Sequence, residues 1–176
     1  MDRLDILSIA SIAALALAIL FMLTNQGVVA GRQHNSAALA RENAAYAAQV
    51  EADKKIFQGV ASFMEKGLYS EASASLDGIM KKYPDKSLSY VYLAQLDLKQ
   101  GKLGKSVHNY RKAVEMQPDY VDKKTPLYQG EEITKVVKEG MDKFEREKAL
   151  KPDDKAVKRA LKNVYYLQRR MAGGCE

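Results

Sequence analysis

The chain begins with an unbroken run of apolar residues. Residues 6–23 read ILSIASIAALALAILFML, with no charge, proline or glycine, and the uncharged stretch continues through Gly31. A helix of this length would reach about 27 Å, close to the hydrocarbon thickness of a bilayer, about 30 Å. We therefore expect residues 1–31 to form an N-terminal transmembrane anchor of the single-pass type.

A cleaved signal peptide is the alternative for the same segment. The small residues at 28–30, Val-Val-Ala, resemble the pattern that precedes a cleavage site. However, the apolar run is longer than that of a typical signal peptide, and Asp2 and Asp5 offset Arg3 before it. These features favour a retained anchor.

Small residues recur every four positions in the apolar run, at Ala10, Ala14 and Ala18. They would share one helix face and allow two membrane helices to pair closely, although alanine is also simply common in such helices. The flanking basic residues, counted strictly, favour a cytoplasmic location for the rest of the chain. The short N-terminal tail favours the opposite face, and we expect the periplasmic side of a bacterial inner membrane.

Beyond the anchor the pattern changes to an alanine-rich, mixed-charge segment. Residues 36–53 read SAALARENAAYAAQVEAD. Alanine has the highest helix propensity, so residues 32–52 are predicted to be a helical stalk or linker. Gly27 and Gly31 predict a break between the anchor and the stalk.

The rest of the chain is periodic. The dipeptide Pro-Asp occurs at 84–85, 118–119 and 152–153, so that each copy follows the last by 34 residues. Proline cannot continue a helix, and aspartate caps the next one. The same offset relates Gly67 to Gly101, where glycine allows a tight turn between two helices. Each unit is therefore predicted to be helix, turn, helix, and the fold class is all-α.

Residues 87–119 resemble one tetratricopeptide (TPR) repeat. The matching positions are Tyr90, Leu93, Ala94, Gly101, Ser106, Tyr110, Ala113 and Pro118. Asp97 departs from the pattern, because the family usually has an aromatic residue there. The resemblance implies a short α-solenoid of helix-turn-helix repeats over residues 53–170.

The other units are predicted from the same alignment. Residues 53–86 and 87–120 form the two clearer repeats, and residues 121–152 form a degenerate one, with Lys135 in place of the turn glycine and Gly140 in place of a small residue. We expect a single longer helix there, from about Glu131 to Ala149. Residues 153–170 are predicted to be a capping helix with one apolar stripe, and residues 171–176 a flexible tail.

The resemblance also implies a partner-binding groove lined by the first helix of each repeat. Its predicted lining is Phe57, Ala61, Met64, Val91, Gln95, Leu98 and Lys99. This lining lacks the Lys and Asn residues with which some members clamp a terminal carboxylate, so an amphipathic helix or an extended apolar peptide would suit it. The alternative is that the larger apolar members, Phe57, Met64, Val91 and Leu98, are core.

Candidate chemistry is sparse. Gly104-Lys105-Ser106 resembles the end of a phosphate-binding loop, but Lys99 stands where that motif needs a glycine. His34 and His108 have no His or Cys at ligand spacing, and Cys175 is the sole cysteine. We expect no enzyme activity, no metal site and no cofactor.

Charge adds one further alternative. The net charge is +6, and basic residues outnumber acidic ones between Lys148 and Arg170. The leading expectation is a membrane-anchored scaffold that binds protein partners during assembly of a bacterial envelope complex, with no nucleic acid and with possible self-association. The alternatives are an accessory subunit of cytochrome or respiratory-complex maturation, and a binder of anionic lipid or polymer through the basic final helix.

Overall fold

A computed structural model describes the backbone of residues 3–173, and side chains at Leu15, Leu17, 19–21 and 38–173. Over residues 3–173 the chain is helical, with six α-helices, one short 3-10 helix and no strand. The predicted all-α class is therefore confirmed. The chain divides into two compact units, residues 1–48 and 49–176, which are described separately.

The first unit is formed by helix α1, which is assigned from Arg3 to Glu65 and enters the second unit. The break predicted at Gly27 and Gly31 is absent, because both residues are helical. A glycine costs a helix only about 1 kcal/mol relative to alanine, so isolated glycines do not end one. The alanines predicted to pair two anchors, Ala10, Ala14 and Ala18, have side chains outside the described residues.

The described side chains of the first unit include several large apolar groups that are exposed. They are Leu15, Leu17, Ile19, Leu20 and Phe21. Among the residues that the structure describes, none of the helices meets the length and hydropathy that a membrane crossing requires.

The second unit opens with the end of α1 and helix α2, Tyr69–Lys82. Between them Gly67 has a φ of +72°, and the Leu68 amide donates to the Phe63 carbonyl at 2.9 Å. This bond and the left-handed glycine close the helix end in a Schellman turn. The two helices bury one apolar cluster, made of Phe57, Val60, Ala72 and Leu76 together with Leu96 of the next helix.

The same turn recurs 34 positions later, between α3, Leu88–Lys99, and α4, Leu103–Met116. Gly101 also has a φ of +72°, and the Lys102 amide donates to the Asp97 carbonyl at 2.7 Å. The side chain of Asp97 accepts from Asn109 Nδ2 at 2.9 Å. The acid that departs from the family pattern thus ties α3 to α4.

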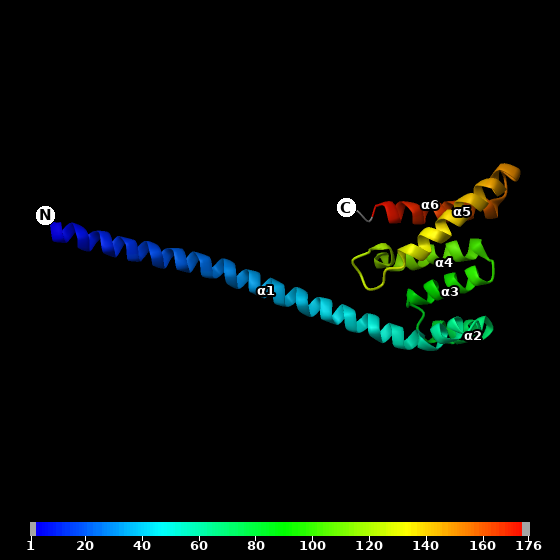
Figure 1. Cartoon of the computed structure of the whole chain (residues 1–176), viewed down its shortest axis with the longest axis horizontal. Coiled ribbons are helices and arrows are strands. Elements are labelled where there is room, and N and C mark those ends of the chain that lie inside the picture. The colour runs from blue at the N-terminus through cyan, green and yellow to red at the C-terminus, as the bar shows by residue number, and fades with distance from the viewer. Residues whose placement is uncertain (1–2, 174–176) are drawn as a thin grey trace. The chain divides into compact units, whose positions relative to one another are not determined.

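The last pair follows a 3-10 helix, Pro118–Val121, and consists of α5, Gly130–Leu150, and α6, Lys155–Ala172. The sequence places α5 within one residue of its observed ends. α4 contacts α3, α5 and α6, and α5 also packs along α6 (Figure 1). The larger core lies among these helices, and its fully buried side chains include Tyr110, Tyr120, Ile133 and Leu167.

A partly exposed hydrogen-bond network joins three helices at the edge of this core. Glu132 Oε2 on α5 accepts from Tyr110 Oη on α4 at 2.9 Å and from Gln95 Nε2 on α3 at 2.7 Å. Burial raises the pKa of Tyr110, and the nearby Glu132 carboxylate raises it further. The tyrosine therefore stays a neutral donor, and the network fixes how α3, α4 and α5 align.

Candidate functional site

The residues predicted to line a groove do not share one environment. Phe57 and Val91 lie in the interior, Phe57 fully enclosed and stacked on Tyr92 with ring centroids 5.4 Å apart. Met64 and Leu98 are half-buried and pack against the two cores. These positions match the alternative that the large apolar members are core.

The three remaining residues of the predicted groove lining are small or polar. Ala61 is half-buried, and Lys99 is exposed at the end of α3. Gln95 is half-buried and donates to Glu132, so its amide is already engaged within the fold. The accessible surface at this place is consequently smaller and more polar than the sequence suggested.

Hollows of the second unit lie on both sides of α6. This helix carries six basic residues and no acidic one, Lys155, Lys158, Arg159, Lys162, Arg169 and Arg170. Asp154 precedes it and caps it, accepting from the amides of Ala156 and Val157 at 2.7 and 3.2 Å. Its buried stripe, which includes Leu161, Val164 and Leu167, faces the core and leaves the basic residues outside.

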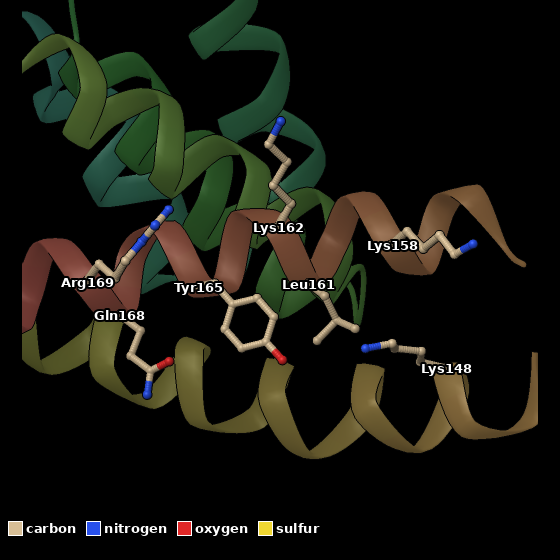
Figure 2. A pocket seen from close by; sticks show the side chains of 7 residues that line it. All are labelled: Lys148, Lys158, Leu161, Lys162, Tyr165, Gln168 and Arg169. Atoms are coloured by element: carbon tan, nitrogen blue, oxygen red, sulfur yellow. The ribbon is translucent and has the colours of Figure 1, made fainter. Parts of the chain in front are cut away.

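The first hollow lies between α5 and α6 and has a volume of about 510 Å³. Figure 2 shows Leu161, Tyr165 and Gln168 pointing toward α5, and Lys148 reaching back from α5. Lys162 and Arg169 point to the opposite side of α6. The Tyr165 hydroxyl donates to the Glu145 carboxylate, which places a negative charge beside this hollow.

The second hollow is a groove between α4 and α6, formed by two adjoining pockets of about 570 and 330 Å³. The two pockets share His108, Arg159 and Asn163. The basic lining consists of Lys102, Lys105, Arg111, Lys112, Lys143, Arg159 and Lys162, and the acidic lining of Glu115 alone. We call this the α4–α6 groove.

Helix α4 supplies one wall of the groove because of its own periodicity. Lys105, His108 and Lys112 follow each other at spacings of three and four, on the face opposite the buried Ser106 and Tyr110. Residues at such spacings lie on one side of a helix. Lys112 Nζ also lies over the Tyr90 ring, 4.2 Å from its centroid.

The floor of the groove is held rigidly. Asn163 is 3 % exposed, and its Oδ1 accepts from Arg111 Nη1 at 2.9 Å. Arg111 also donates through Nε to Glu115 at 2.7 Å and lies 4.9 Å from the Tyr166 ring centroid. Arg111 is thus neutralised and positioned by its neighbours. Among the described residues, Lys105, Arg159 and Lys162 have no ion-pair or hydrogen-bond partner through their side chains.

The sequence indicated the basic face of α6, which forms one wall of the α4–α6 groove, but not the other wall, which is formed by α4. The signal was present in Lys105, His108 and Lys112, whose spacing marks one exposed side of α4. The sequence did not predict that α4 packs against α6, because the two helices are far apart along the chain. The sequence analysis did not identify Asn163, because it lies among the apolar residues of α6.

No protein family, curated protein or solved structure matches the chain. Within the described part of the chain, no group of three or more His, Cys, Asp or Glu residues is arranged to hold a metal ion.

Proposed function

We propose that the chain is a membrane-attached helical scaffold that binds protein partners and carries out no chemical step. The observation that carries this proposal is the repeated turn. Gly67 and Gly101 share a φ of +72° and the same closing hydrogen bond, 34 residues apart. The contacts between α2 and α3, which lie between these two turns, support stacking of the two helix pairs as in a TPR-like solenoid.

Membrane attachment is supported by the N-terminal segment. Residues 6–23 are uncharged and apolar in sequence, and Leu17 and Phe21 are 70 % and 69 % exposed in the first unit. Apolar surface of this kind is stable when a bilayer or another protein covers it. We place the helical unit on the periplasmic side of a bacterial inner membrane, with assembly of an envelope complex as its role.

The test is recovery of partners from membranes. Full-length chain with a C-terminal affinity tag is extracted in mild detergent, and the co-purifying proteins are identified by mass spectrometry. Residues 1–48 with the same tag serve as the control for proteins that follow any membrane helix. A scaffold retains a defined set of proteins with the full chain alone, in fixed ratio to it. Identical sets from both would contradict the proposal.

A binder of anions through α6 is a second candidate, favoured by one observation. All six charged side chains on α6 are positive, so this helix alone accounts for a charge equal to the +6 of the whole chain. Such a concentration of one sign attracts anionic partners and makes association sensitive to salt.

A further inference from the structure

We propose that the α4–α6 groove binds an extended acidic segment of a partner protein. This inference rests on the proposed scaffold function and names the surface and the partner chemistry. The groove juxtaposes the α4 stripe, Lys105, His108 and Lys112, with Arg159 and Lys162 of α6.

The charge of the groove selects a negative partner. Seven Lys and Arg side chains line it against one carboxylate, and that carboxylate, Glu115, is already paired with Arg111 at 2.7 Å. Lys105, Arg159 and Lys162 are exposed and lack a side-chain partner in the described residues. Desolvating like charges together is unfavourable, and acidic groups placed between them relieve that repulsion.

One end of the groove offers a second attraction for a carboxylate. Gly101, Lys102, Leu103 and Gly104 line the groove where α4 begins. No side chain caps this helix, and the first amides of a helix have no acceptor within it. The Lys102 amide already donates to the Asp97 carbonyl and the Lys105 amide to the Lys102 carbonyl. A carboxylate beside the first turn of α4 would accept from the remaining amides, those of Leu103 and Gly104, and meet the positive end of the helix dipole.

The shape and floor of the groove favour a peptide over other anions. Leu103, Ala156 and Ala160 add apolar surface to the basic lining of the groove. No aromatic side chain lines either pocket, so the stacking platforms that single-stranded nucleic acids use are absent from these described residues. A flat bilayer surface would meet only the outer ends of the exposed lysines, whereas an extended peptide can enter the hollow between the two helices.

The length of the groove sets the size of the segment. From Lys102 to Lys112 the α4 wall rises through ten residues, about 15 Å at 1.5 Å per residue. An extended peptide advances roughly 3.3 Å per residue, so about five residues occupy the groove. Acidic side chains at alternate positions would face the basic walls, with small side chains toward the floor.

The test measures binding of a defined probe to the full-length chain in zwitterionic detergent. The probe is a fluorescent octapeptide of alternating Asp and Ala, blocked at both ends. The groove variant is Lys105→Gln with Arg159→Gln, and the control variant is Lys135→Gln with Lys138→Gln, which removes the same charge from exposed positions of α5. Thermal unfolding of both variants checks that the helices remain packed.

We expect saturable binding that weakens with added salt and that falls about tenfold in the groove variant, as loss of two partly exposed ionic contacts implies, and less than twofold in the control. Equal loss in the two variants would overturn the proposal, since binding would then follow net charge. So would groove-dependent binding of octadeoxythymidylate or of monomeric dihexanoylphosphatidylglycerol in preference to the peptide. If the groove variant retained every partner in the co-purification experiment, the proposal for the groove would be overturned and the proposed scaffold function would still stand.

Discussion

At the scale of single residues, two buried hydroxyls stand out because they lack partners. Ser106 Oγ on α4 and Ser89 Oγ on α3 are enclosed and make no hydrogen bond among the described residues. Ser106 is fully buried where α4 packs into the core. A buried polar group without a partner destabilises the fold, since it has lost its hydrogen bonds to water.

Ser106→Ala is therefore expected to stabilise the protein. The substitution removes one unsatisfied oxygen, creates little empty space and improves helix propensity, for a gain of about 1 kcal/mol in the free energy of unfolding. Urea denaturation followed by circular dichroism measures it as a higher midpoint at unchanged slope. His108→Ala on the exposed side of the same helix controls for propensity. A lower midpoint for Ser106→Ala would mean that the hydroxyl has a partner in solution.

Tyr120 makes stability depend on alkaline pH. Burial raises its pKa to about 12, and its hydroxyl lies 3.0 Å from Ser87 Oγ. A raised pKa means that the folded state disfavours the tyrosinate, while the unfolded chain ionises near its ordinary value of about 10. The stability that the neutral, buried Tyr120 contributes is therefore complete below pH 10 and is lost as pH rises from about 10 to about 12.

The measurement is the tyrosinate absorbance during alkaline titration of the folded chain, compared with Tyr120→Phe. We expect the wild-type curve to contain a late component near pH 12 that the variant lacks. Tyr110, whose pKa is also raised, should still ionise late in both proteins. If all ten tyrosines of the wild type ionised together near pH 10 while the helices remained folded, the buried position of Tyr120 would be wrong.

At the scale of helices, Gly140 lets α5 lie close to both α6 and α4. A Cβ added there would lie 2.8 Å from Val164 Cγ2 of α6 and 3.5 Å from Val107 Cγ2 of α4. The sequence identified Gly140 as an irregular position in a degenerate repeat. In the structure it is the contact at which three helices meet.

Gly140→Ala is expected to lower stability by roughly 1–3 kcal/mol, because the overpacking exceeds the gain of up to about 1 kcal/mol in helix propensity. Gly78→Ala in α2 is the matched control, since beyond its own helical turn no atom lies within 4 Å of its added Cβ. The control should stabilise by the propensity gain alone. Denaturant midpoints of both variants decide the point, and a gain of equal size in the two would contradict the close packing at Gly140.

The sequence predicted helices better than it predicted surfaces. The Pro-Asp spacing and the two turn glycines located the ends of α2, α3 and α4 closely, because proline and left-handed glycine act on the local backbone. The sequence left Val91 open between groove and core, since burial of an apolar side chain depends on which helix packs over it, and the structure gives it 2 % exposure. The α4–α6 groove was missed for the same reason. Its two walls are about fifty residues apart in sequence and share no local pattern.

At the scale of the whole molecule, charge and hydrophobicity are concentrated at different ends of the sequence. The apolar run occupies residues 6–23, and the basic helix α6 spans Lys155–Ala172. If the first unit lies in a bilayer, its exposed leucines are covered by lipid, and charges introduced there must be desolvated. A lysine near the centre of a membrane helix costs about 2.5–3.5 kcal/mol, so two of them offset much of the favourable insertion energy.

We therefore expect Leu17→Lys with Leu20→Lys to release the protein from membranes. Wild-type chain should stay in the pellet after alkaline carbonate extraction, whereas a large share of the double variant should appear in the supernatant. Leu17→Val with Leu20→Val keeps the segment apolar and should behave as wild type. Because these positions lie in residues 1–48, thermal unfolding of the helical unit at 49–176 should be unchanged in both variants. Wild-type chain in the supernatant would instead require another protein to cover the apolar run, and the scaffold would then join two protein surfaces without a membrane.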